Sequence, residues 1–264
     1  MEQRQLCRPT SRRRGCSGKR WCGSLLIVCV RMFRALHGVL LLGICAALAS
    51  CAGPGVQRKD TSRTFNTVVV DAGHGGKDRG AYRPPGPSEK MAALDVAQRL
   101  NRKLRESQFR TLMVRNRDVF VPLDRRVAIG NRVDNSIFVS IHFNYSPRRS
   151  IRGFEVYYAS PYARGLALGI QRKLMTLPGA RNRGVHTAGF RVIKNSVYPS
   201  VLVECGYLTN PAERGYASRA AYREALADKI AEGIVEARYG PGVYHARPQV
   251  MVPVQEQFGG NPPP

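Results

Sequence analysis

Three side chains that could do chemistry follow short apolar runs in this sequence. His74 lies just after Thr-Val-Val-Val-Asp, His142 comes directly after Ser-Ile-Phe-Val-Ser-Ile, and Glu204 ends Ser-Val-Leu-Val-Glu. Runs of this kind are typical of buried strands. In an open α/β sheet, ligands bind beyond the carboxyl ends of the strands. We therefore expect these three residues to meet at one edge of a sheet.

A fourth residue completes a possible metal site. Glu89 opens the first long helical stretch, after a proline-rich loop over 83–87. Two histidines and one carboxylate can bind zinc and leave a fourth position open for water. Zinc polarises a carbonyl group and lowers the pKa of water. A second carboxylate that does not bind the metal can carry a proton to a leaving amine. Together, the four residues indicate zinc-dependent hydrolysis of an amide.

Each of these residues also has a plainer interpretation. A histidine after a strand can simply be packed or solvated, and Glu89 suits the first turn of a helix because of the helix dipole. Glu204 could be the exposed end of its strand. The glycine-rich turn around His74 could hold a phosphate, although it lacks the Lys-Ser/Thr pair of a P-loop. Residue chemistry alone leaves these interpretations open.

The elements that must position these residues alternate along the chain. Apolar and β-branched runs predict strands over 67–71, 110–115, 136–141, 153–158, 190–194 and 200–204. Apolar residues at spacings of three and four predict helices over 89–107, 122–133, 161–177 and 220–238. Ser88 is the expected N-cap of the first helix. Alternation of strands and helices indicates a single α/β domain with helices on both faces of the sheet.

The segment before this domain has the features of an export signal. From Met32, the expected true start, a basic residue precedes an apolar stretch over 35–50, and Leu-Ala-Ser-Cys ends it. That stretch is shorter than the roughly 20 residues that span a membrane. The ending resembles the bacterial lipobox, which would make Cys51 the site of lipidation. Ala52 instead of Asp then favours the outer membrane if the organism has two membranes. An uncleaved anchor helix is the alternative.

The domain organisation follows from these boundaries. Residues 1–50 are expected to be an N-terminal extension and a lipoprotein-type signal peptide, and 51–65 a polar linker. The folded domain is expected over 66–240. Residues 241–264 are rich in proline and are predicted to be a disordered tail.

The composition narrows the choice of partners. The chain has 42 Lys and Arg against 18 Asp and Glu, a net charge of +24, so its surface would attract any polyanion. Nucleic acid is not an expected partner, because the sequence has no motif of a known binding module and the signal would export the protein. Of the seven cysteines, only Cys205 lies beyond residue 51. We therefore expect a domain without disulfides.

Four ordered motifs between about 68 and 234 resemble the zinc-dependent N-acetylmuramoyl-L-alanine amidases of the third amidase type. The family's first histidine motif resembles VVVDAGHGGKDRGA, which implies that His74 is a zinc ligand. Its Glu-Lys helix start resembles SEKMAALDVAQRL, which implies the same for Glu89. Its Ser-Ile-His-x-Asn motif resembles FVSIHFN and implies the third ligand, His142. Its last strand resembles YPSVLVECGYLTNP and places the catalytic carboxylate on Glu204.

The resemblance implies one zinc ion and a mixed, mostly parallel sheet of about six strands. It implies hydrolysis of the amide between N-acetylmuramic acid and L-alanine in peptidoglycan, in wall remodelling or daughter-cell separation. Asn144 and Arg126 match family positions near the site and are candidates for substrate or structural contacts. Cys205 stands where the family more often has Ser or Thr, and a small buried residue is expected there.

Expectations about partners follow from the same resemblance. They are peptidoglycan, the membrane through a lipid anchor at Cys51, and division or wall-binding proteins, with the enzyme facing the periplasm. Some family members carry an inserted helix that blocks the zinc, and the 61 residues between His142 and Glu204 show no such insertion. Activity without an activator is therefore expected. The alternative is a lipid-anchored peptidoglycan-binding protein without catalysis, but binding alone does not need Glu204.

Overall fold

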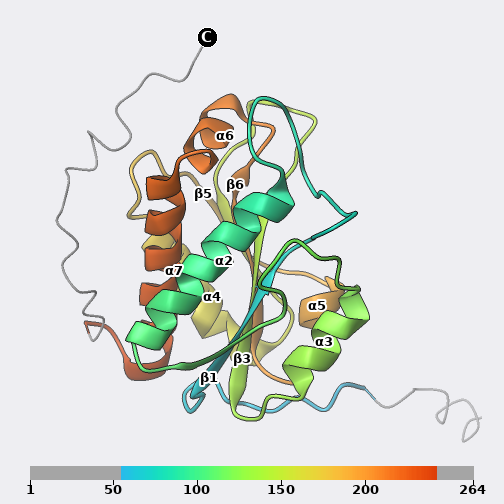
Figure 1. The fold of residues 1–264 in the computed structure, drawn as a ribbon. Helices are drawn as coiled ribbons and strands as arrows, with labels where there is room; N and C mark the ends of the chain where they lie inside the picture. The colour runs from blue at the N-terminus through green and yellow to red at the C-terminus, as the bar shows by residue number, and fades with distance from the viewer. Residues whose placement is uncertain (1–54, 243–264) are drawn as a thin grey trace, which may run out of the picture. The chain divides into compact units, whose positions relative to one another are not determined.

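The computed structural model describes residues 55–242, which Figure 1 shows in colour. The expected signal segment, the start at Met32, Cys51 and the tail from 243 onward lie outside the described residues. Among the described residues, no helix combines the length and the apolar character needed to cross a membrane.

A six-stranded sheet forms the centre of the domain, in the order β2-β1-β3-β6-β4-β5. Its strands are β1 (Thr67–Ala72), β2 (Arg110–Met113), β3 (Ser136–Asn144), β4 (Phe154–Tyr158), β5 (Asn182–Thr187) and β6 (Ser200–Tyr207). The first four in sheet order run parallel, and β4 pairs antiparallel with β6 and parallel with β5. The sheet is therefore mixed and mostly parallel, as the resemblance implied.

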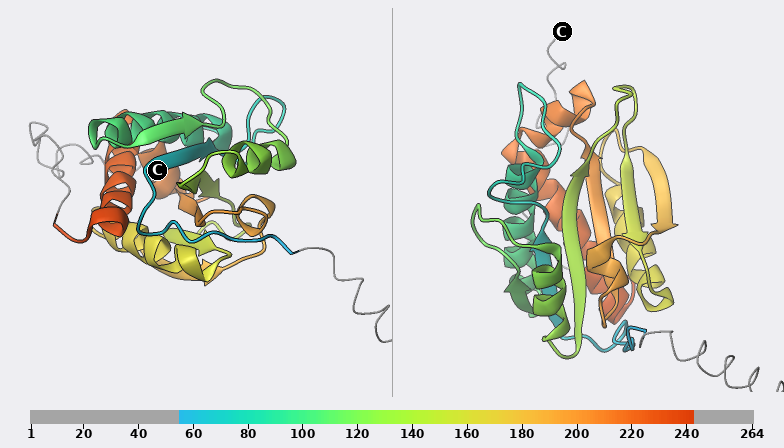
Figure 2. Two further views of the ribbon diagram at one scale, coloured as in Figure 1. Left: turned by 90° about the horizontal axis from the view of Figure 1, so that it is seen from below. Right: turned by 90° about the vertical axis from the view of Figure 1, so that its right-hand side faces the viewer.

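Helices cover both faces of this sheet. They are α2 (Glu89–Glu106), α3 (Leu123–Asn131), the 3-10 turn η1 (Pro161–Ala163), α4 (Arg164–Leu174), α5 (Arg191–Lys194), α6 (Pro211–Ala217) and α7 (Ala220–Tyr239). Figure 1 shows α7 on the left of the sheet and α3 and α5 on the right, and Figure 2 shows the same elements from below and from the side. The predicted fold, one α/β domain with helices on both faces, is confirmed.

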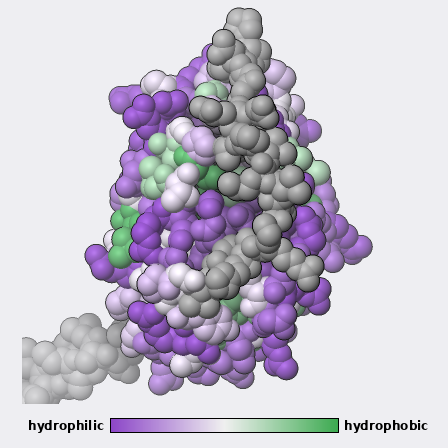
Figure 3. Space-filling view, turned by 90° about the vertical axis from the view of Figure 1, so that its left-hand side faces the viewer, coloured by the Kyte–Doolittle hydropathy of each residue, from purple (hydrophilic) through white to green (hydrophobic). Residues whose placement is uncertain are grey.

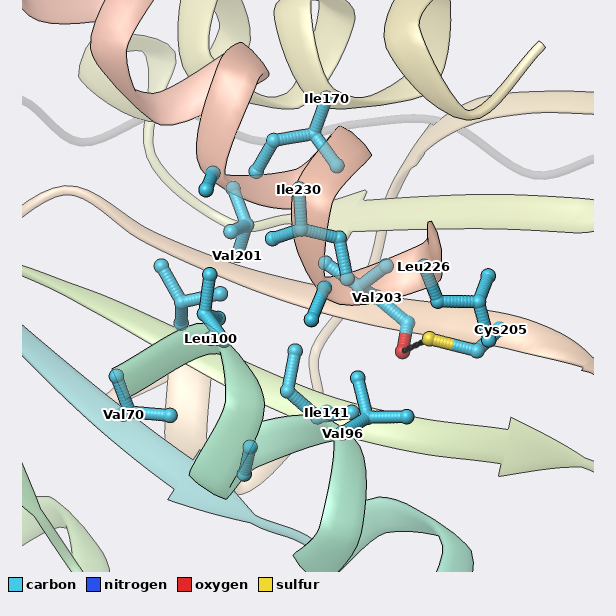
Figure 4. Packing of buried hydrophobic residues seen from close by; sticks show 14 of the residues in the cluster. Val70, Val96, Leu100, Ile141, Ile170, Val201, Val203, Cys205, Leu226 and Ile230 are labelled. Carbon is cyan, nitrogen blue, oxygen red and sulfur yellow. Dashed lines mark hydrogen bonds between the residues drawn. The ribbon is translucent and has the colours of Figure 1, made fainter. Parts of the chain in front are cut away.

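Two hydrophobic clusters hold these layers together. The larger one packs α2, α4 and α7 on one face of the sheet, and Figure 4 shows its centre, where Val96, Leu100, Ile170 and Ile230 meet strand residues. The smaller one joins the other face to the helices α3 and α5. Because β1 and β3 are covered on both faces, nearly every residue in them is buried, which explains their continuous apolar runs. The described surface visible in Figure 3 is mostly hydrophilic.

The strand predicted over 190–194 is wrong. Residues Arg191–Lys194 form the short helix α5, and the strand at this edge of the sheet is β5, over Asn182–Thr187. Val192 and Ile193 are neighbours in sequence and both are buried, which a helical turn allows and an edge strand does not. The strand β5 has a single large apolar residue, Val185, so it has no alternating pattern to reveal it.

Helix α6 was not predicted, although its start has a clear signal. Asn210 accepts hydrogen bonds from the backbone N–H groups of Ala212 and Glu213, and Pro211 occupies the first helical position. An N-cap asparagine followed by proline is a standard helix start. At α2, Ser88 does hold the N-cap position, but its side chain makes no capping bond. The backbone carbonyl of Ala81 instead accepts from the N–H of Glu89.

Part of the predicted linker 51–65 packs on the domain. The N–H of Lys59 donates to the carbonyl of Val197 at 2.8 Å, and the Thr61 hydroxyl donates to the carbonyl of Ser136 at 2.6 Å. Phe65 is buried and stacks on Phe109, with ring centroids 5.5 Å apart. The packed part of the chain therefore begins near residue 58, earlier than the boundary at 66.

Candidate active site

The carboxyl ends of three neighbouring strands carry the site. Strand β1 ends at Ala72, two residues before His74, while His142 and Glu204 lie near the ends of β3 and β6. His142 and Glu204 are paired across these two parallel strands. Since side chains alternate along a strand, both point to the face that α3 and α5 cover. The sequence prediction that strand ends would bring these residues together is confirmed.

His74, Glu89 and His142 form a compact cluster. Each offers one ligand atom, and these atoms lie within 4.8 Å of one another. The Oε1 atom of Glu89 is 2.9 Å from His74 Nε2 and 2.9 Å from His142 Nδ1. Two imidazoles and one carboxylate at this spacing are a donor set that fits zinc. The structure thus brings the three predicted ligands together, and their binding of a metal stays a prediction.

Glu89 is held firmly at the centre of this cluster. Its Oε2 accepts from the N–H of Ala81 at 2.7 Å, and its Oε1 accepts from the N–H of Phe143 at 3.1 Å. Burial raises the pKa of this carboxyl group, but hydrogen bonds from His142 and His74 outweigh burial and lower the pKa to about 2. A carboxylate that stays ionised in a buried place supplies a negative charge for a cation.

A tight turn after β1 aims His74 at Glu89. His74 has a φ of 58°, in the left-handed region, and its Nδ1 lies 2.8 Å from Asp78 Oδ2. Because an ionised carboxylate only accepts, this contact keeps a proton on Nδ1, while Nε2 faces Glu89 and is the ring atom that could bind a metal. Carboxylates often orient metal-binding histidines in this way. Asp78 lies within the first histidine motif of the sequence, where nothing indicated its role.

Two buried arginines fix the backbone of this turn. Arg115 donates to the carbonyls of Ala72 and Gly73, at 2.9 and 2.6 Å. Arg126 donates to the Asp71 carboxylate at 2.7 Å and to the carbonyl of His74 at 2.6 Å. Arg126 was a candidate for substrate or structural contacts, and these hydrogen bonds of its guanidinium group are structural contacts. Arg115 could not be singled out from the sequence, because it only appeared as the last residue of the strand predicted over 110–115.

Glu204 differs from Glu89 in its surroundings. Its Oε2 atom is buried and has no hydrogen-bond partner among the described residues. Burial, followed by the nearby charges of Glu89 and Glu155, raises the pKa of Glu204 well above the usual value. A buried carboxylate with an unused oxygen, paired across the strands with His142, is suited to exchange protons or to face a cation. This orphaned oxygen supports the fit of a metal ion at the neighbouring cluster.

Asn144 lies beside the cluster and faces a different residue. Its Nδ2 donates to Glu155 Oε2 at 2.9 Å, and its Oδ1 accepts from the N–H of Tyr145 at 2.7 Å. Glu155 is buried on β4, directly opposite Glu204 on β6, and also accepts from the hydroxyl of Tyr157 at 2.8 Å. Asn144 therefore positions Glu155 next to Glu204. Glu155 could not be singled out from the sequence, because its strand has the pattern of ordinary core.

Cys205 follows Glu204 on the opposite face of the sheet. Its side chain is buried in the larger hydrophobic cluster, where Figure 4 shows it near Leu226. Its sulfhydryl group donates a long hydrogen bond to the carbonyl of Val203, at 3.9 Å. The sequence prediction of a small buried residue at this position is confirmed.

An α/β sheet that gathers two histidines and one carboxylate near its strand ends, next to a second carboxylate at the start of α2, suits a metal-dependent hydrolase. Residues 68–236 match the Amidase_3 family, described as N-acetylmuramoyl-L-alanine amidase. The chain therefore belongs to this family of amidases.

Individual relatives agree with this assignment. N-acetylmuramoyl-L-alanine amidase LytC of Bacillus subtilis is 38% identical in an alignment of 191 residues that covers 69% of this chain and 38% of LytC. The uncharacterized protein YqiI of the same organism is 37% identical, over 75% of this chain and 95% of YqiI. The structure of amidase AmiC2 of Nostoc punctiforme superposes with a TM-score of 0.63 and 36% identity, over 64% of this chain and 95% of that one. The match to LytC thus spans well under half of that protein.

Proposed function

We propose that this chain hydrolyses the amide bond between N-acetylmuramic acid and L-alanine in peptidoglycan, and that one zinc ion bound by His74, Glu89 and His142 takes part. The observation that carries the proposal is the cluster itself, with three ligand atoms within 4.8 Å of one another in a chain of the amidase family. A zinc ion in such a site polarises a carbonyl oxygen and lowers the pKa of water.

The protein's own part in the reaction falls to Glu204 and Asp78. The free Oε2 of Glu204 accepts a proton from the attacking water and delivers it to the nitrogen of L-alanine as the carbon–nitrogen bond breaks. One water is consumed, and a carboxylic acid and an amine leave. Asp78 holds the His74 ring in one orientation and one tautomer.

Two variants test these assignments and separate them from binding without catalysis. Glu204→Gln should keep one zinc per chain and lose at least about a hundredfold in turnover, the range that general acid–base catalysis supplies. His74→Ala should lose both zinc and turnover. Zinc is measured by mass spectrometry of the purified protein and turnover by digestion of muropeptides. If Glu204→Gln cleaved at the normal rate, Glu204 would not be the base. If the wild-type protein bound peptidoglycan and released nothing, the binding-protein alternative would hold.

We further propose that the protein is exported, lipid-anchored at Cys51 and faces the periplasm, where it acts in wall remodelling or daughter-cell separation. Support comes from the apolar segment and the lipobox-like ending, which lie outside the described residues. Its substrate there is peptidoglycan, and its protein partners are division or wall-binding proteins. Labelling with a fatty acid should mark the wild type and not Cys51→Ser. Equal labelling of the two would reject Cys51 as the anchor.

We also propose that the enzyme is active without an activator. Between β3 and β6 the described chain holds only β4, η1, α4, β5 and α5, all of them parts of the sheet or its cover. The side chains of His74 and His142 remain partly exposed. A purified protein that begins at Cys51 should digest isolated sacculi by itself. Digestion that begins only when a partner protein is added would overturn this.

A further inference from the structure

A pocket of about 430 Å³ opens beside the cluster, between α3 and α5. One wall of the pocket is formed by His74 and His142, so any molecule bound in it lies against the proposed metal ligands. The remaining walls are mostly apolar and include Phe120, Val121, Leu123, Phe190, Val192 and Leu202. The volume lies within the roughly 300–1,000 Å³ that is common for ligand sites.

The rim of this pocket exposes large apolar side chains. Phe120, Leu123 and Phe190 are 43%, 53% and 44% exposed. Phe120 lies in the loop before α3 and Leu123 is the first residue of α3, while Phe190 is the N-cap of α5, so the rim has two sides. Exposed apolar groups gathered around a pocket mark a binding surface. They favour a neutral ligand with apolar faces.

The opposite side of the cluster has different chemistry. Among the described residues that line the pocket is Leu202 of β6. Glu204, two residues later on the same face of this strand, is not one of them. Beyond Glu204 come β4 and β5, where the exposed Arg183 pairs with Glu155 at 2.5 Å. Arg152 is on the same side, because a Cβ on its neighbour Gly153 would lie 2.9 Å from Arg183 Cγ. This side is polar and carries two guanidinium groups that reach the surface, those of Arg152 and Arg183.

The proposed substrate also has one part with apolar faces and one charged part. On the acyl side of its amide is an uncharged sugar, whose ring carbons present apolar faces, and on the amine side is a peptide with free carboxylates. Because Glu204 delivers a proton to the leaving nitrogen, the peptide must lie on the Glu204 side of the cluster. The acyl side then points toward His74 and the apolar pocket.

We propose that the pocket between α3 and α5 binds the sugar of N-acetylmuramic acid and that the stem peptide lies over β6 and β4. The aromatic faces of Phe120 and Phe190 pack on the sugar ring, and Arg152 and Arg183 attract the peptide carboxylates. This assignment rests on the proposed function, since the position of the leaving amine sets the direction of the substrate.

Two synthetic substrates test the assignment. They share one stem peptide and differ in the acyl group, which is N-acetylmuramoyl in one and D-lactoyl in the other. Phe190→Ala and Leu123→Ala should lower kcat/KM for the muramoyl substrate about tenfold or more and leave the lactoyl substrate within about twofold, as expected for a lost apolar contact. Leu168→Ala, which changes a 40% exposed leucine on α4, is the control and should change neither. An equal loss on both substrates would overturn the proposal.

A binding measurement makes the test independent of catalysis. The disaccharide of N-acetylglucosamine and N-acetylmuramic acid is titrated calorimetrically into metal-free protein. The proposal predicts binding that Phe190→Ala weakens about tenfold and Leu168→Ala leaves unchanged. Absence of binding, or binding that Phe190→Ala does not weaken, would overturn it. Disaccharide binding at the pocket without cleavage of any substrate would instead leave the pocket assignment standing and reject the proposed hydrolysis.

Discussion

A single added methyl group at Gly80 tests whether the loop before α2 fixes the metal ligands. Gly80 has a φ of +61°, and a Cβ there would come within 2.4 Å of Glu89 Oε2 and 2.7 Å of His74 Cδ2. Glu89 cannot move aside easily, because Oε2 accepts from the N–H of Ala81 and Oε1 contacts both histidines. Gly80→Ala should therefore disturb the cluster without replacing any ligand.

The size of this effect follows from two contributions. An alanine in the left-handed region costs roughly 1–2 kcal/mol, and overpacking a tight site costs about 1–3 kcal/mol more. Gly179→Ala is the matched control, because Gly179 has a φ of +71° and nothing within 4 Å of its added Cβ. The control should show only the first cost. The difference between the two variants isolates the contact with His74 and Glu89.

Two assays read out this difference. Urea unfolding of the metal-free proteins should show Gly80→Ala to be less stable than Gly179→Ala by about 1–3 kcal/mol. Competition with a chelator should show about tenfold or more weaker zinc binding for Gly80→Ala, as is typical when the support of a ligand is disturbed. Gly179→Ala should bind zinc normally. Equal stability and equal zinc affinity of Gly80→Ala and Gly179→Ala would show that the loop before α2 does not position Glu89 and His74.

Further predictions concern support of the site and of the helices. Asp78→Asn should weaken zinc binding about 10- to 100-fold, measured by chelator competition, because it removes the charge that orients His74; unchanged affinity would contradict that role. In Glu224 of α7, burial raises the pKa but hydrogen bonds from Lys103 and Arg99 outweigh it and lower the pKa below the usual 4.5. Because the pKa of Glu224 is lower in the folded protein, its ion pairs stabilise the fold at pH values above the usual pKa. This contribution is lost as the pH falls through the pKa of the folded state. Glu224→Gln should therefore make unfolding in urea less dependent on pH below about 4.5, and an unchanged dependence would contradict the pairing.

The sequence predicted the parts of the fold that carry strong local patterns. The strands β1, β3 and β6 are continuous apolar runs because helices cover both faces, and α2 and α7 have long amphipathic or apolar stretches. Strand β5 was missed because it lies at the sheet edge and its residues are mostly exposed. Helix α5 was taken for a strand, since two β-branched residues in a four-residue helix look the same as a short strand.

The site was predictable to the extent that its residues follow strands. The places of His74, His142 and Glu204 follow from the rule that strand ends meet. Glu89 was a candidate because it opens the first long helix, and the family motifs then implied a separate role for each of the four residues. The supporting contacts could not be predicted, because they depend on distances across the fold. Arg126 reaches the turn after β1 from α3, 52 residues away in sequence. Glu155 meets Glu204 only because β4 joins β6 in the antiparallel direction.

The most direct test of the central claim is mass spectrometry of the products released from intact sacculi. The purified, zinc-loaded protein should release free stem peptides that begin with L-alanine and leave glycan strands with unsubstituted N-acetylmuramic acid. Glu204→Gln, which should still bind zinc, should release none above the background of a reaction without enzyme. Products cut within the stem peptide, or the same peptides released by Glu204→Gln at the wild-type rate, would contradict the account.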